Sequence, residues 1–133
     1  MDLDDLAWRF TDFIFNGCFP SHLHDQLAGE LVKARLMKAS RRFDEALEVI
    51  DKTLQRMPKY PEALFLKAQI LREGYADYSG AKACLEKVLR IKKMRNEKDE
   101  TIRRWSEHML KEMREEKRAQ RRRVEKDKRR GSS

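Results

Sequence analysis

The chain has 133 residues, of which 41% are charged and 40% apolar, and its net charge is +8 at pH 7. Few Gly and Pro beside abundant Leu, Ala, Glu, Lys and Arg favour a single all-α domain with a tail. No apolar run approaches the roughly 18 residues of a membrane span, and the acidic N-terminus is unlike a basic signal peptide, so we expect a cytoplasmic protein.

Residues 1–20 are predicted to form an amphipathic helix, Asp2 to Phe15, followed by a turn. Its early aspartates suit the positive end of the helix dipole. We expect this helix to cover the open end of the helices that follow. The alternative is self-association into a weak homodimer, or docking of a partner, because large apolar patches usually mark interfaces. The apolar and aromatic residues are Leu3, Leu6, Trp8, Phe10, Phe13, Ile14 and Phe15.

A long helix is predicted from His22 to about Ala39, capped by Ser21. One face carries Leu23, Leu27, Leu31 and Ala34. Cys18, His22 and His24 precede or begin this helix and could suggest a metal site. Their spacing matches no common zinc pattern and a fourth ligand is missing, so we expect no metal and no cofactor.

The central part of the chain repeats itself. Ala34 and Ala68 lie 34 positions apart, and Ala46 and Ala81 lie 35 apart, so one extra residue falls in the turn of the second copy. Self-similarity at this period indicates an array of helical hairpins. Further pairs that match between the copies are Lys33 with Lys67, Phe43 with Tyr78, Ile50 with Leu85, and Leu54 with Leu89.

The pattern resembles the tetratricopeptide repeat. The first copy has Glu30, Lys33-Ala34, Met37, Ala46, Ile50 and Pro58, and the second has Leu64, Lys67-Ala68, Leu71, Ala81 and Leu85. Neither copy has the aromatic opening residue of the family, and the second lacks the closing proline. The resemblance implies a short α-solenoid of antiparallel helical hairpins with N- and C-terminal capping helices. An unrelated bundle of helical hairpins is the alternative.

Small residues are predicted where the two helices of each hairpin approach closely, because large ones would push the axes beyond about 8–10 Å. Turns are expected at Ser40–Asp44 and Gly74–Tyr78, with Asp44 and Ser79 as N-caps. Pro58 and Pro61 bracket a break that cannot lie inside one helix.

The second hairpin is predicted from Pro61 to about Ile91, with Cys84 as a small buried or half-buried side chain. Cys18 and Cys84 form no disulfide framework and suggest a reducing compartment. After a polar connection over 92–98, Asn96 or Asp99 can cap a third helical unit. Its apolar stripe, Ile102, Trp105, Met109 and Met113, predicts a helix that caps the second repeat and completes a domain over 21–113.

Residues 114–133 are predicted to be a basic, solvated helical extension and tail. Between 114 and 130 there are ten Lys or Arg and four Asp or Glu, a balance of +6, and little for the helix to bury. The densest cations are Arg121, Arg122, Arg123, Lys128, Arg129 and Arg130.

The resemblance implies a protein-interaction module whose first helices line a concave groove. The groove positions that it implies are Leu31, Arg35, Lys38, Phe65, Gln69 and Arg72. We expect this basic surface to bind an acidic protein or peptide. Its cations need acids, either from the N-terminal helix or from the partner. The asparagines that hold a peptide C-terminus in some members are missing here.

Two other functions are possible from the sequence. The basic tail could bind nucleic acid or another anionic surface, although no aromatic residues are interleaved for base stacking. An enzyme is disfavoured, because no nucleophile–base pair, Gly-rich phosphate loop or metal set is evident.

Overall fold

A computed structural model describes residues 22–131, which form five α-helices and no β-strand. They are α2 (His22–Ala39), α3 (Phe43–Arg56), α4 (Pro61–Tyr75), α5 (Tyr78–Arg90) and α6 (Glu97–Gly131). The all-α prediction is therefore confirmed over this range. Within the same range, no helix has the combination of length and apolarity needed to cross a bilayer. The predicted N-terminal helix and the Ser21 cap lie outside the described residues.

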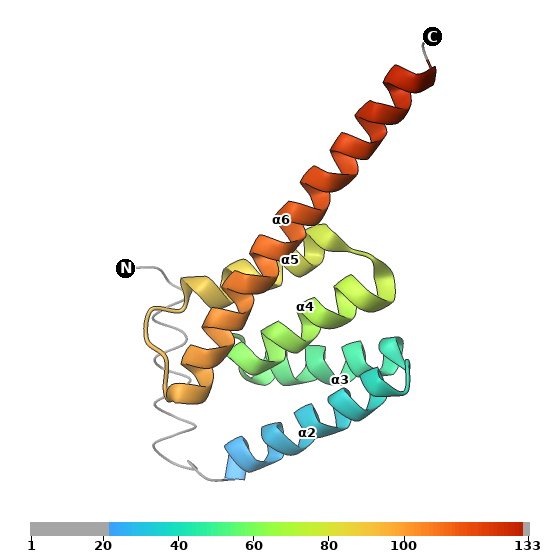
Figure 1. Ribbon diagram of the computed structural model, residues 1–133. Helices are drawn as coiled ribbons and strands as arrows, with labels where there is room; N and C mark the ends of the chain where they lie inside the picture. Colours follow the sequence, from blue (N-terminus) through green and yellow to red (C-terminus); the bar gives the residue numbers. More distant parts are fainter. Residues whose placement is uncertain (1–21, 132–133) are drawn as a thin grey trace.

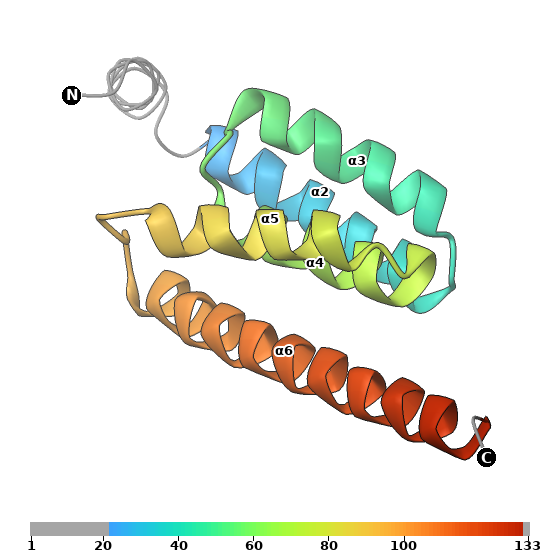
Figure 2. The same cartoon turned by 90° about the horizontal axis from the view of Figure 1, so that it is seen from above.

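The helices stack as antiparallel hairpins. The largest contacts join α2 to α3 and α4 to α5, while α4 also packs on α3. Figures 1 and 2 show α2 and α6 on opposite sides of α4, with α6 extending well past the other helices. The predicted breaks are confirmed, because the helices are interrupted after Ala39, after Arg56 and after Tyr75. This arrangement is compatible with a helical repeat.

The two hairpin turns share one backbone feature. Arg41 has φ 59° and Ala76 has φ 50°, so both lie in the left-handed region. They are 35 positions apart, the same offset that separates Ala46 and Ala81 in the second helix of each hairpin. The internal repeat therefore extends to the backbone of the turn. A left-handed residue at a helix C-terminus lets the next amide bond back to the last turn. The Asp77 amide, for example, donates to the carbonyl of Leu71 at 2.9 Å.

The predicted N-caps are wrong. The cap of α5 is Asp77, whose Oδ1 accepts a hydrogen bond from the Gly80 amide at 2.9 Å. The cap of α3 is Arg42, which makes no side-chain cap bond. Asp44 instead lies inside the first turn of α3, where its carboxylate accepts from the hydroxyl of Tyr75. Both helices therefore begin slightly earlier than the sequence indicated.

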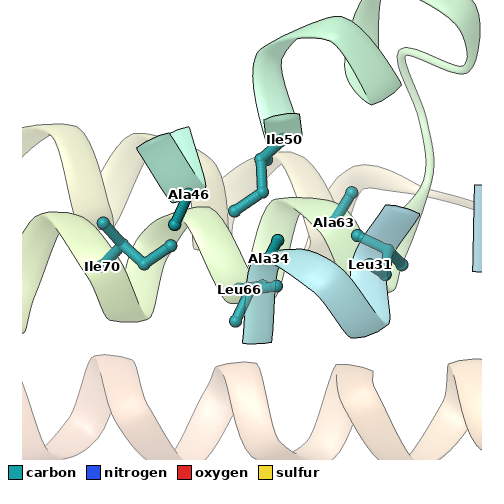
Figure 3. Packing of buried hydrophobic residues seen from close by; sticks show 7 residues of the cluster. All are labelled: Leu31, Ala34, Ala46, Ile50, Ala63, Leu66 and Ile70. Carbon is teal, nitrogen blue, oxygen red and sulfur yellow. The ribbon is translucent and has the colours of Figure 1, made fainter. Parts of the chain in front are cut away.

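Fully buried alanines allow the helices to approach closely. Ala34, Ala46 and Ala63 have no exposed surface and lie where α2, α3 and α4 meet, beside Ile50 and Leu66 (Figure 3). Ala68 and Ala81 occupy the corresponding contact between α4 and α5 and are also completely buried. The predicted close contacts at small residues agree with these positions.

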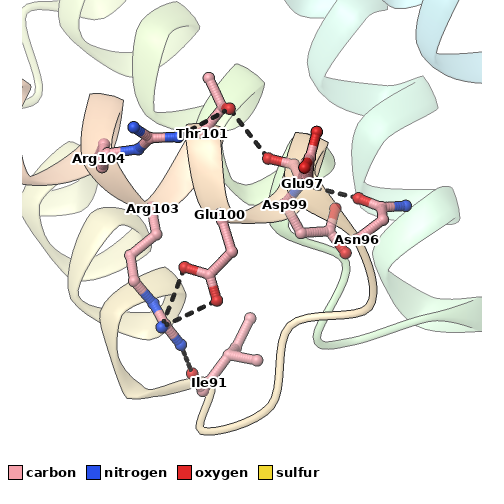
Figure 4. A network of polar contacts seen from close by, with 8 residues as sticks. All are labelled: Ile91, Asn96, Glu97, Asp99, Glu100, Thr101, Arg103 and Arg104. Atoms are coloured by element: carbon pink, nitrogen blue, oxygen red, sulfur yellow. Dashed lines mark hydrogen bonds and ion pairs between the residues drawn. The ribbon is translucent and has the colours of Figure 1, made fainter.

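The third helical unit begins with a cap that the sequence did indicate. Asn96 Oδ1 accepts a hydrogen bond from the Asp99 amide at 2.9 Å, just where α6 starts (Figure 4). Arg103 then donates to the carbonyl of Ile91 at the end of α5 and pairs with Glu100. These polar contacts hold the start of α6 against the end of the second hairpin.

The buried face of α6 differs in part from the prediction. Ile102 and Met113 are buried as expected, but Trp105 is 56% exposed. Ser106 and Leu110 are buried in its place and pack toward α4 and α5. The Ser106 hydroxyl donates to the Ile102 carbonyl at 2.8 Å, which satisfies it inside the core. From 114 to 131 every residue is exposed while the helix continues, as predicted for the extension.

Candidate functional site

A cleft of about 410 Å³ lies between α2, α4 and α6. Most of its lining comes from α4 and from the first turns of α6, and α2 contributes Arg35 from its C-terminal half. Side chains of both polar and apolar kinds line it: Arg35, Glu62, Phe65, Leu66, Gln69, Lys98, Thr101, Ile102 and Trp105.

Two aromatic rings form the apolar part of the cleft. The ring centroids of Phe65 on α4 and Trp105 on α6 are 5.9 Å apart, and the ring planes are tilted by 43°. Such tilted pairs are favourable geometries for aromatic side chains. Because Trp105 remains more than half exposed while Phe65 supports it, the indole presents a fixed apolar surface to solvent.

A shared carboxylate joins the two walls. The Glu62 side chain is 10% exposed and contacts the guanidinium of Arg35, while its Oε2 lies 3.1 Å from Lys98 Nζ. Two cations therefore meet one carboxylate, which leaves an excess positive charge beside Trp105. The Arg35 and Lys98 side chains are 47% and 64% exposed, so both can contact a further anion from solvent.

The less exposed cations of this surface, Lys38 on α2 and Arg72 on α4, are paired within the chain. Lys38 Nζ lies 3.3 Å from Gln69 Oε1 and 3.5 Å from a Glu73 carboxylate oxygen. Arg72 reaches across to α6, where it contacts Glu112 at 3.4 Å and Glu116 at 2.5 Å. The acids that we expected from the N-terminal helix or a partner are thus supplied, for these cations, by α4 and α6. This end of the surface is less basic than the sequence indicated.

Of the six residues predicted for the groove, three line the cleft: Arg35, Phe65 and Gln69. Lys38 and Arg72 lie beside them through the contacts just described. Leu31 does not belong to this surface, because it is 1% exposed and packs in the core with Ala34 and Leu66. Its placement in the groove is corrected for that reason.

Sequence reasoning missed Glu62, Lys98 and Trp105. Trp105 was assigned to the buried stripe of α6, and neither charged residue carried a signal of its own. What brings them together is the packing of α6 on α4, a contact between segments about forty positions apart in the chain. The sequence did contain a signal, because Leu110 and Met113 belong to an equally regular apolar stripe on α6 that does not include Trp105.

The six predicted tail cations are all exposed along the last turns of α6. Arg129 pairs with Glu125 at 3.1 Å, so part of the positive charge is offset along the helix. An open concavity in this region is lined by residues of α6 alone, between Lys117 and Lys128. The extension therefore presents a charged, solvent-exposed helix surface.

The remaining candidates offer no site. Cys84 is buried as predicted, and burial raises the pKa of its thiol above the usual value, although Lys67 and Lys87 act in the opposite direction. Cys18 and the side chains of His22 and His24 lie outside the described part. Elsewhere in that part, no three His, Cys, Asp or Glu side chains converge as metal ligands would.

Comparison with known proteins found no matching family model, no matching curated protein and no matching solved structure.

Proposed function

We propose that this chain is a non-catalytic protein-interaction module, a tetratricopeptide-like pair of repeats that binds a segment of another protein in the cleft between α2, α4 and α6. The observation that carries the proposal is the exposed indole of Trp105, supported by Phe65 and flanked by Arg35 and Lys98. Binding sites in interfaces are enriched in Trp and Arg held in such semi-enclosed positions.

The chemistry of the cleft favours a ligand with two features. An apolar side chain would cover the indole, because this buries aromatic surface at little cost in side-chain entropy. A neighbouring carboxylate would pair with Arg35 and Lys98, which share only Glu62 between them. We therefore propose a short segment in which an apolar residue stands next to Asp or Glu.

The test is selection from a random peptide display library on the intact chain. We expect enrichment of an apolar residue beside an acidic one. Trp105→Ala should weaken the selected peptides about tenfold or more, as loss of a central aromatic contact usually does. Arg35→Gln should weaken acidic peptides and reduce the dependence of their affinity on salt.

Two controls keep this test specific. Tyr78→Ala removes an aromatic side chain that is similarly exposed, 52%, at the start of α5 and away from the cleft. The double variant Arg122→Glu, Arg129→Glu reverses charge in the extension and leaves the cleft intact. If the selected peptides lose affinity in the controls and keep it in Trp105→Ala, the cleft is not the binding site.

A second candidate function uses the extension of α6. Its exposed cations favour an anionic surface such as nucleic acid, through contacts that are insensitive to sequence and sensitive to salt. The same Arg122→Glu, Arg129→Glu variant tests this candidate against a mixed-sequence duplex. Affinity that is unchanged by the double reversal, or unchanged between low and moderate salt, would exclude it.

A further inference from the structure

Three positions of α2 form an exposed apolar strip. Val32 is 52% exposed and Leu36 is 64% exposed, and a Cβ atom on Gly29 would meet no other part of the described structure within 4 Å. The spacing 29, 32 and 36 puts all three on one face of the helix. We call Gly29, Val32 and Leu36 the α2 strip.

The internal repeat identifies what this face does elsewhere in the fold. At the period of 34 residues, the α2 strip corresponds to Ala63, Leu66 and Ile70 of α4. These three are 0%, 4% and 0% exposed, because α2 and α3 pack over them (Figure 3). Equivalent positions are thus fully covered in the second hairpin and open in the first. Among the described helices, none lies on the side of α2 away from α4 (Figure 1).

We propose that residues 2–15 pack as a helix on the α2 strip, in a contact equivalent to the one that α3 makes with α4. This segment directly precedes α2, and its predicted length is similar to the 14 residues of α3 and the 13 of α5. It carries apolar residues at helical spacing that need a surface to cover. Gly29 fits the role, since its counterpart Ala63 is a close-contact position in the second hairpin.

Charge favours this occupant over a second copy of the chain. Lys33 and Arg35 flank the α2 strip on its two sides, as the spacing of 100° per residue places them. Residues 2–15 contain four aspartates and one arginine, which complements Lys33. Arg35 already pairs with Glu62, and Asp25 lies one turn before Gly29 on the same face of α2. In a symmetric dimer the same surface meets itself, so the strip would face a surface of the same net charge.

Limited trypsin digestion of the full chain tests the proposal. Arg9 is the only Lys or Arg that precedes Lys33, so cleavage after it yields a unique fragment. Cleavage in the exposed extension over 114–130 provides an internal reference in the same reaction. We expect the bond after Arg9 to be cut at least tenfold more slowly than those reference bonds.

Two variants should release that protection. Val32→Asp with Leu36→Asp places charge on the strip, and we expect cleavage after Arg9 to accelerate about tenfold. Gly29→Gln tests the same contact by bulk, because a Cβ atom at this position meets nothing within 4 Å in the described structure, and the longer side chain should interfere with a docked segment. Gly29→Ala, which restores the residue of the second repeat, should leave the rate unchanged.

Controls and contrary outcomes are distinct. Lys52→Asp changes charge on the exposed side of α3 and should have no effect on cleavage after Arg9. An unchanged cleavage rate in both the double variant and Gly29→Gln overturns the proposal, as does rapid cleavage in the parent chain. A parent dimer that the double variant converts to monomer, with cleavage after Arg9 unaffected, would assign the strip to a second copy instead. Circular dichroism establishes that each variant keeps its helices.

Discussion

Replacement of Ala68 by Leu examines the close contact between α4 and α5 directly. Ala68 is completely buried, and its neighbours Ala81 and Leu85 are completely buried too. Leucine adds three carbon atoms, whose burial would contribute about 2.4 kcal/mol at roughly 0.8 kcal/mol each if space existed. Because Ala68 has no exposed surface and is enclosed by buried residues of α5 and α6, we expect the helices to separate, and overpacking of this kind costs about 1–3 kcal/mol net. We expect the same for Ala34→Leu.

The assay is thermal unfolding followed by circular dichroism. A loss of about 1–3 kcal/mol corresponds to a decrease in Tm of roughly 4–12 °C for a domain of this size. Ala83→Leu is the matched control, because Ala83 is exposed on α5 and the same substitution there should change stability by less than about 0.5 kcal/mol. Equal melting temperatures for Ala68→Leu and Ala83→Leu would refute the close packing that defines the hairpin.

Three further outcomes follow from the contacts. Truncation after Met113 should lower the free energy of unfolding by less than about 1 kcal/mol, because residues 114–131 are all exposed and the ion pair Arg72 to Glu116 that they contribute to the body lies at the surface; a larger loss in urea denaturation would mean that the extension packs somewhere. Gly74→Ala should destabilise by about 1–3 kcal/mol despite the better helix propensity, since the new Cβ would lie 2.6 Å from the Phe43 ring; a higher Tm would show that the ring moves freely. The raised pKa of the Cys84 thiol predicts stability that is complete below its ordinary value of 9.0 and declines as pH rises toward the folded value, because the unfolded thiol ionises first; Cys84→Ala should lose less stability than the parent between pH 7 and pH 10.

Residues that obey local rules were predicted well from the sequence. The prolines at 58 and 61, the Asn96 cap and the paired alanines indicated helix bounds and contacts that the structure has. The N-caps were wrong because Asp44 and Ser79 are adequate capping residues by type, and the choice of Arg42 and Asp77 depends on the left-handed residues that precede each helix.

The site was harder to predict because it depends on long-range packing. Apolar residues at 109, 110 and 113 allow two stripes on α6, and the one with Ser106 and Leu110 buries small and aliphatic side chains against α5. Because this stripe is the buried one, Trp105 faces the cleft, and Glu112 and Glu116 face Arg72. A cation on a helix face gives no sign in sequence of the acid that will face it.

The continuity of α6 fixes the separation of its two functional candidates. The exposed indole and the cationic stretch belong to one helix without a break from Glu97 to Gly131. At about 1.5 Å per residue, the part beyond Met113 extends roughly 27 Å from the last buried turn. A flexible tail of the same composition could fold back and place its cations over the cleft. The continuous helix prevents such folding back. A peptide in the cleft and an anion at the far end of α6 would therefore stay a constant distance apart.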